Sequence, residues 1–458
     1  MKQRIYKGLL MAGIVLGLFS ACKQDKMEYV HLKGRLVDMP TRTVTMSYDG
    51  ASSFLGNSKD ITLSLDKDGC FDTIFPLNTP SYFNISRNTI YLEPGDDLTV
   101  EISTKNSEAK FEGRGAEANE YMKDRLFPHA GSFLEGGMNV KEDFESTRCF
   151  IDSLAMERRN QLIALQHVSS EFKNLEKARI SADLLNSYSY YPIYANIQAQ
   201  IRKTPELAIR KHQMDSFYTA LSKDTKLWVE ELNQEAFLDV AAVRSMLASL
   251  ITERHLNSWC EGIVFNPMAQ ELVQAAVHVD NLSHQLNTET LDKAVLFANE
   301  MSNQEYANEL RTKIEEARQL LSGPAIDFTF VDLDGNSYRL SDFKGKVIYL
   351  DFWATWCGPC VKESPYFEAL AKEFADKKDI VFLAISTDAN QKTWANYLKT
   401  NTKQLPQYHS TDKALKEEWG LKYIPRFVLI DRDFNIVEAY APKPSEDRTR
   451  ELLLKLLK

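Results

Sequence analysis

A pair of cysteines directly after an apolar run is the feature that most restricts how this chain can fold. Residues 347–350 are Val, Ile, Tyr and Leu, a run typical of a strand buried on both faces of a sheet. Cys357 and Cys360 follow, and Phe367 and Leu370 then continue a helical apolar face. The pattern places Cys357 at a helix N-terminus, where unpaired backbone N–H groups and the helix dipole favour a thiolate.

This spacing suits thiol–disulfide exchange, which needs an attacking thiolate and a neighbouring thiol to resolve the mixed disulfide. A thiol pKa lowered from about 8.5 to about 7 raises the thiolate fraction from ~3% to ~50%, but it lowers nucleophilicity roughly five-fold. The net gain is only about three-fold, so geometry and partner docking must supply most of the catalysis. The alternative is half of a zinc site. Zinc needs four ligands, and the sequence has no second Cys-x-x-Cys pair.

The region around the cysteines reads as alternating strands and helices. We expect strands at 326–330, 338–340, 380–385 and 427–430 and near Ile436. Helices are expected after Cys360, near Trp394 and at the C-terminus up to Lys458. Strands that alternate with helices predict an α/β sheet covered on both faces.

Two other regions precede this one, as expected for 458 residues, which exceed a single hydrophobic core. Between Met27 and Phe111 apolar and polar residues alternate, with turn signals such as Asp68-Gly69. This predicts a small antiparallel β sandwich of about six to eight strands. From Ala116 to Leu321 the apolar spacing changes to three and four residues, which predicts a bundle of about seven to nine helices.

The first residues read as an export signal. Lys2, Arg4 and Lys7 precede an apolar run at 8–19 that is too short to span a bilayer. The run and the following Ser and Ala resemble a bacterial lipoprotein signal at 1–21, which would make Cys22 the lipidated first residue; the usual Leu is replaced by Phe at position 19. An ordinary secretory signal is the alternative. Both predict export, and no later segment is long and apolar enough for a membrane helix.

Charge and residue spacing argue against several other functions. The net charge of −9, with no dense basic stripe, argues against a nucleic-acid partner. The eight histidines show no metal-binding spacing, so no metal or cofactor is expected. The G-x-G-x-x-A stretch at 113–118 follows a predicted β-domain strand and opens no βαβ unit, so it is not interpreted as a dinucleotide site. The remaining cysteines are predicted to be buried small apolar residues: Cys70, Cys149 and Cys260.

Residues 350–360, Leu-Asp-Phe-Trp-Ala-Thr-Trp-Cys-Gly-Pro-Cys, resemble the active-site segment of thioredoxin. The runs at 340–346 and 420–425 extend the resemblance to envelope relatives of the TlpA/ResA type. It covers about 323–458 and implies a thioredoxin fold and periplasmic disulfide reduction. The predicted organisation is a signal peptide at 1–21, a β-rich domain at 22–115, a helical domain at 116–322 and a thioredoxin-like domain at 323–458.

The resemblance also implies roles for single residues. Cys357 would be the nucleophile and Cys360 the buried resolving thiol. Asp351 matches thioredoxin's buried carboxylate, which exchanges protons with the resolving cysteine, and burial should raise its pKa; the alternative is a carboxylate at an exposed strand end. Glu363 matches an acidic residue of the envelope relatives, the alternative being a solvated helix face. Which of the two carboxylates handles protons stays open.

The remaining site residues are expected to bind substrate. Ile424 and Pro425 match the cis-proline loop that faces the cysteines and can pair with an extended substrate strand. Trp356 is expected to cover the disulfide, the alternative being core packing. The Gly358-Pro359 dipeptide is thioredoxin's and favours a reductase over an oxidant.

The sequence thus predicts an enzyme, a lipid-anchored, periplasm-facing reductase of disulfides in exported proteins. It would be recharged by a membrane thiol donor of the CcdA or DsbD kind. A peroxiredoxin-like peroxidase is disfavoured because the P-x-x-x-T-x-x-C arrangement is absent. A scaffold or binding protein, in which the two leading domains recognise a partner, is the second alternative.

Overall fold

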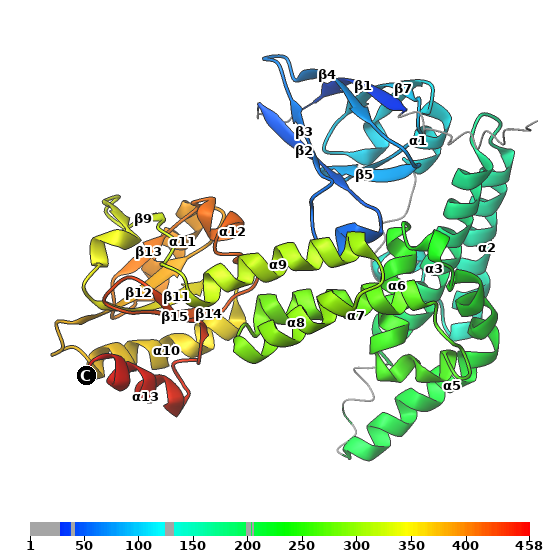
Figure 1. Cartoon of the computed structure of the whole chain (residues 1–458). Coiled ribbons are helices and arrows are strands. Elements are labelled where there is room, and N and C mark those ends of the chain that lie inside the picture. Colours follow the sequence, from blue (N-terminus) through cyan, green and yellow to red (C-terminus); the bar gives the residue numbers. More distant parts are fainter. Residues whose placement is uncertain (1–27, 38–41, 124–131, 198–202, 204–205) are drawn as a thin grey trace, which may run out of the picture.

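The computed structural model describes residues 28–37, 42–123, 132–197, 203 and 206–458. Within these residues the chain forms a β-sheet part, a helical part and a C-terminal α/β part in that order (Figure 1). The export signal and Cys22 lie outside the described residues. Across the described ranges, no helix combines the length and the apolarity that a membrane crossing requires.

Two four-stranded sheets make up the β part, ordered β4-β1-β7-β8 and β3-β2-β5-β6. Alternate residues such as Val30, Leu32 and Leu98 pack between the sheets in one apolar cluster. The prediction of a wholly antiparallel domain was wrong at one pair, because β1 and β7 run parallel. The strands are β1 (Tyr29–Leu36), β2 (Thr43–Tyr48), β3 (Ile61–Ser64), β4 (Cys70–Pro76), β5 (Ser81–Ile85), β6 (Asn88–Leu92), β7 (Asp97–Ile102) and β8 (Lys110–Gly113).

The helical part follows directly. Several of its helices begin at side-chain caps, for example Asp143, which accepts a bond from the Ser146 backbone N–H at 2.7 Å. The helices described between Ala116 and Ser322 are α1 (Ala116–Met122), α2 (Phe144–Ala164), α3 (Ser170–Tyr194), α5 (Leu207–Leu232), α6 (Ala241–Thr252), α7 (Pro267–His284), α8 (Thr288–Glu300) and α9 (Gln304–Ser322).

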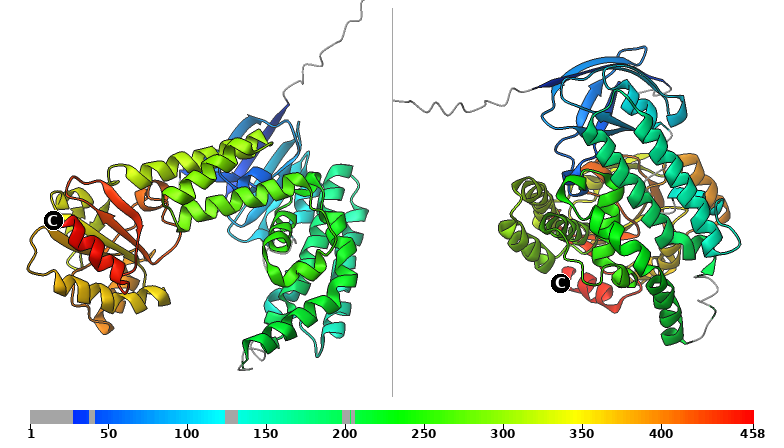
Figure 2. Two further views of the ribbon diagram at one scale, coloured as in Figure 1. Left: turned by 60° about the horizontal axis from the view of Figure 1, so that its bottom comes forward. Right: turned by 90° about the vertical axis from the view of Figure 1, so that its right-hand side faces the viewer.

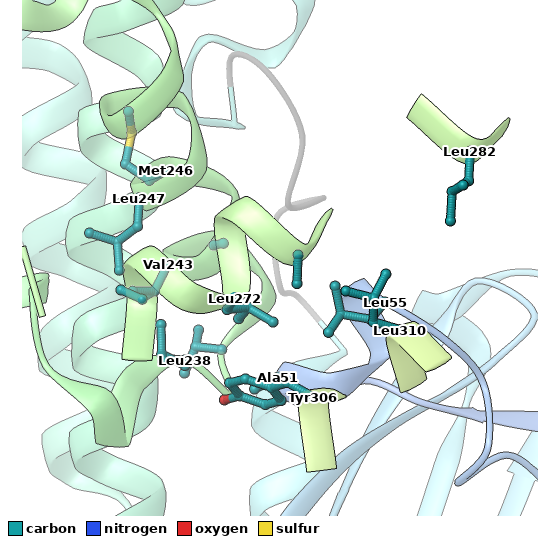
Figure 3. Close-up of a cluster of buried hydrophobic side chains, with 14 of the residues drawn as sticks. Ala51, Leu55, Leu238, Val243, Met246, Leu247, Leu272, Leu282, Tyr306 and Leu310 are labelled. Atoms are coloured by element: carbon teal, nitrogen blue, oxygen red, sulfur yellow. The ribbon is translucent and has the colours of Figure 1, made fainter. Parts of the chain in front are cut away.

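A loop of the β part packs into the helical part. A short 3-10 turn, Ala51–Phe54, precedes Leu55, which lies beside Leu310 of α9 in the cluster of Figure 3. The backbone N–H of Ala51 donates to Asp239 Oδ1 at 2.7 Å. Arg244, 4% exposed at its side chain, forms an ion pair with Asp49 at 2.8 Å. Apolar burial and these polar bonds together join the β part to α6, α7 and α9.

The C-terminal part is built on a seven-stranded sheet of order β10-β9-β13-β12-β11-β14-β15. Interior strand β11 pairs in parallel with β12 and antiparallel with β14. The strands are β9 (Thr329–Val331), β10 (Ser337–Arg339), β11 (Val347–Trp353), β12 (Ile380–Ser386), β13 (Gln407–His409), β14 (Arg426–Ile430) and β15 (Ile436–Ala441). The helices are α10 (Gly358–Glu373), α11 (Gln391–Thr400), α12 (Ala414–Glu417) and α13 (Asp447–Leu456).

Successive residues of β11 point to opposite faces of the sheet. Val347 and Tyr349 join a cluster with side chains of α10, α11 and α13. Ile348 and Leu350 join a larger cluster that continues through Ile314 of α9. Figure 1 and the left view of Figure 2 show the same relation, with α7, α8 and α9 between the C-terminal sheet and the other helices. The helical part therefore packs directly against the α/β part.

The three spare cysteines correct a sequence-based prediction. Cys70 and Cys149 are exposed and Cys260 is only partly buried, and all three are free thiols. Cys70 begins β4 with its side chain on the solvent face, because the inward positions of that strand belong to Phe71 and Phe75. Composition does not reveal which face of an element a residue occupies, and the expectation of three buried thiols was wrong.

Candidate active site

Cys357 and Cys360 form a disulfide at the start of α10. Cys357 is the N-cap of the helix, and the backbone N–H of Cys360 donates to its Sγ at 3.2 Å. Cys357 is 4% exposed and Cys360 1% exposed. The Cys360 N–H and the positive end of the helix dipole stabilise negative charge on the sulfur of Cys357. The arrangement can hold a thiolate once the disulfide is reduced.

The segment before the disulfide is fixed by Asp388, a residue that the sequence did not single out. Asp388 is buried, and its carboxylate accepts bonds from the Thr355 N–H at 3.0 Å and the Thr355 hydroxyl at 2.7 Å. The Ser386 hydroxyl donates to it at 2.8 Å, and His409 Nε2–H donates to its backbone carbonyl at 2.7 Å. The sequence alone held no signal for this contact, because the residues after β11 and β12 are known to meet at one edge of the sheet only once the parallel pairing of the two strands is known.

Asp351 lies in β11 on the same face as Val347 and Tyr349, between Ala384 of β12 and Phe427 of β14. It is 4% exposed, and within the described chain its Oδ1 has no hydrogen-bond partner. Burial raises the pKa of this carboxyl to about 8; Lys403 acts against the rise and Glu363 adds to it. The alternative of an exposed strand end is therefore wrong for Asp351.

Glu363 and Lys403 are the charged groups that act on this carboxyl. Glu363, on α10, is partly exposed and accepts bonds from the Ser445 N–H at 3.2 Å and hydroxyl at 3.1 Å. Lys403 donates to the Ser364 hydroxyl at 2.6 Å. Asp351 and Glu363 therefore differ. The Asp351 carboxyl is buried and its Oδ1 lacks a hydrogen bond among the described residues, whereas the Glu363 carboxylate is hydrogen-bonded at the surface.

The Ile424–Pro425 peptide bond is cis, as the resemblance implied. Ile424 packs against the apolar cluster that contains both cysteines, which brings the loop to the site. Arg426 follows and is 3% exposed; its guanidinium donates to the carbonyls of Ala439 at 3.0 Å and Trp419 at 2.7 Å. Desolvation lowers the pKa of Arg426. This buried anchor was not predicted from the sequence.

Trp356 is 73% exposed, so the alternative of core packing is excluded for it. Nearby apolar side chains are also open to solvent, with Val361 at 37% and Tyr423 at 55%. These three residues flank the cysteines and the cis-proline in sequence. Exposed apolar side chains of this kind can contact an apolar surface of a partner.

A mixed sheet with a disulfide at a helix start and a cis-proline loop beside it defines the thioredoxin-fold oxidoreductases. Residues 322–455 match the family model described as Redoxin. Thiol–disulfide oxidoreductase ResA of Bacillus thuringiensis subsp. konkukian is 28% identical over 142 residues, 31% of this chain and 82% of that protein. ResA of Bacillus subtilis strain 168 is 27% identical over 129 residues, 28% of this chain and 72% of that protein.

Solved structures resemble the same part of the chain. A candidate thiol–disulfide oxidoreductase of Bacteroides vulgatus is 59% identical and covers 30% of this chain and 98% of its own, with a TM-score of 0.30. The exposed lipoprotein thioredoxin of Streptococcus pneumoniae is 31% identical and covers 28% of this chain and 98% of its own, with a TM-score of 0.26.

The protein is a thiol–disulfide oxidoreductase whose C-terminal part has a thioredoxin fold and belongs to the TlpA/ResA-like family. The two ResA relatives match 31% and 28% of the chain. The β part and the helical part lie outside the family match, which begins at residue 322.

Proposed function

We propose that the protein reduces disulfides of exported proteins in the cell envelope through Cys357 and Cys360. The observation that carries this proposal is the disulfide at the start of α10 with a buried, weakly acidic Asp351 in the strand that leads to it. The sulfur at the helix start supplies the nucleophile, and the second cysteine, one turn into the helix, supplies the resolving thiol.

The reduction balances in two steps. In the first, the Cys357 thiolate attacks a substrate disulfide, forms a mixed disulfide and releases one substrate thiolate. In the second, Cys360 gives its proton to Asp351 and attacks Cys357 Sγ, which releases the second substrate thiolate and leaves the enzyme disulfide. Two electrons pass to the substrate. A carboxyl pKa of about 8 lies close to that of an ordinary thiol, about 8.5, so this proton transfer is nearly balanced in energy.

The dipeptide between the cysteines favours reduction of substrate disulfides over oxidation of substrate thiols. Gly358-Pro359 is the pair found in thioredoxin, whose potential is about −270 mV, against about −120 mV for the oxidant DsbA. That difference corresponds to about 7 kcal/mol for two electrons. The enzyme must then be re-reduced, and the resemblance implies a membrane thiol donor of the CcdA or DsbD kind.

Trapping of the mixed disulfide tests the substrate class. The Cys360→Ser variant keeps the attacking thiolate but lacks the resolving thiol, so it is expected to accumulate covalent adducts with exported proteins. Non-reducing electrophoresis and mass spectrometry would identify the adducts, which a reductant should dissolve. The Cys357→Ser/Cys360→Ser double variant is the control and should trap nothing. If the Cys360→Ser variant captures no protein, the result would instead favour the scaffold or binding alternative.

We also propose that the protein is anchored by a lipid on Cys22 and faces the periplasm. Support comes from the basic start, the short apolar run and the small residues before Cys22. The Cys22→Ser variant is expected to lose incorporation of labelled fatty acid and to shift from the membrane fraction to the unanchored or unprocessed form. Cys70→Ser, at an exposed thiol of β4, is the matched control and should stay lipidated. Full fatty-acid labelling of Cys22→Ser would contradict the anchor.

A further inference from the structure

The loop before the cis-proline lies where the helical part meets the α/β part. Leu421 and Ile424 pack against the large apolar cluster to which α9 contributes Ile314 and Ala317. Ile424 also packs against the cluster that contains the two cysteines. Ile424 thus packs against both the cluster that contains the cysteines and the cluster shared with the helical part.

The end of α7 contacts the same loop through an aromatic pair. The His284 imidazole lies over the Tyr423 ring, with 3.9 Å between ring centroids and 32° between ring planes. The imidazole is fixed from its own helix, because Nδ1 lies 2.9 Å from the Asp280 carbonyl and 3.1 Å from its carboxylate. Tyr423 precedes Pro425 by two residues and remains 55% exposed. One side of Tyr423 is therefore supported by α7 while much of the residue faces solvent.

Charged side chains of α7 and α9 act on the neighbouring residue of the loop. Desolvation lowers the pKa of Lys422, and Lys313 of α9 lowers it further. Glu316 of α9 and Asp280 of α7 act in the opposite direction. The α7 helix thus contacts the loop through His284, and charged groups of α7 and α9 shift the pKa of its Lys422.

We propose that His284 is a specificity-determining positioning residue that fixes Tyr423 as part of the surface for the polypeptide around a substrate disulfide. The inference rests on the proposed reductase function and adds a role for the helical part. Tyr423 and Trp356 are both exposed aromatic residues; Tyr423 lies two residues before the cis-proline and Trp356 directly before Cys357. Exposed aromatic rings can bind an extended segment of a substrate polypeptide that carries apolar side chains next to its disulfide.

His284 contributes to substrate binding indirectly, through Tyr423. Loss of the imidazole leaves both cysteines, Asp351 and the cis-proline in place, but frees Tyr423 to take other rotamers. The free energy that an aromatic pair contributes corresponds to roughly a two- to ten-fold change in an equilibrium constant. The change should appear in substrate binding rather than in the chemical step.

The His284→Ala variant of the whole protein is therefore expected to raise KM for insulin reduction roughly two- to ten-fold, with kcat nearly unchanged. The His284→Phe variant keeps a planar ring and should restore KM. His278→Ala is the matched control on the same helix, because His278 packs against Phe297 inside the helical part and not against the loop. Its KM should equal that of the unsubstituted protein.

A double-mutant cycle with Tyr423→Ala tests the route of the effect. If His284 acts through Tyr423, its replacement should change KM little in the Tyr423→Ala background. An unchanged KM in His284→Ala, or an equal effect in both backgrounds, would overturn the inference. Either result would leave the reductase assignment intact as long as Cys357→Ser is inactive; an active Cys357→Ser would instead remove the proposed function itself.

Discussion

Replacement of Cys357 by Ser is expected to reduce the rate of insulin reduction to the uncatalysed background, a loss of at least about 10³-fold. The thiolate is the nucleophile in disulfide exchange, and a Ser hydroxyl at the same helix start does not ionise near neutral pH. The rest of the site stays in place, because the side chains differ by one atom. Turbidity of reduced insulin, followed with a limiting reductant, gives the rate.

The spare thiols provide the control for this result. Cys260→Ser should keep the full rate, because burial raises the pKa of the Cys260 thiol to about 11 and so keeps it protonated at neutral pH. Cys149→Ser, at an exposed thiol far from α10 in sequence, should also remain active. Substantial activity in Cys357→Ser, or its loss in Cys260→Ser, would place the redox chemistry elsewhere in the chain.

The sequence was most informative where one local pattern determined one structure. The apolar run at 347–350, the cysteine pair and the following helical face predicted β11, the helix start and α10, and each is present. The short elements β13 (Gln407–His409) and α12 (Ala414–Glu417) were missed. The equally short β9 and β10 were predicted because a longer alternation and the Asp334-Gly335 turn mark them, whereas three or four residues alone give too few repeats for a periodic signal. The parallel pairing of β1 with β7 was missed because alternation defines a strand but not its neighbour.

Contacts between residues that are far apart in the chain could not be predicted from one sequence. Asp388 fixes Thr355 across 33 residues, and the order of strands must be known before that pair can be proposed. The contact of His284 with Tyr423 joins the helical part to the α/β part, and no spacing rule relates them. Likewise, the sequence left open which of Asp351 and Glu363 handles protons, whereas the structure distinguishes them by burial.

Asp351→Asn is expected to make protein stability less dependent on pH. Because the folded carboxyl has a pKa of about 8, above its ordinary value of 3.8, the folded state holds its proton to higher pH than the unfolded state does. The stability that the neutral carboxyl contributes is complete below about 3.8 and is lost as pH rises through about 8. That loss amounts to a few kcal/mol as an upper bound.

The variant carries no ionisable group at this position, so the Tm of Asp351→Asn relative to the unsubstituted protein should rise steadily between pH 4 and pH 8. Calorimetry of the oxidised protein measures the difference. Asp376→Asn, at an exposed carboxylate after α10, should show no such trend. A constant difference in Tm over this range would mean that the Asp351 carboxyl titrates normally in the folded protein.

The same substitution should slow catalysis at the step that Cys360 performs. Without the carboxylate, the resolving thiol has no group to take its proton, and loss of a general base typically costs about 10²-fold or more. Attack by Cys357 does not need that base, so the mixed disulfide should accumulate in Asp351→Asn during turnover. In the unsubstituted protein the resolution rate should rise with pH through about 8 as the carboxylate forms, and the variant should lack this rise. Glu363→Gln decides between the carboxylates: if it removes the pH dependence and Asp351→Asn does not, the surface carboxylate handles the proton and the buried one does not.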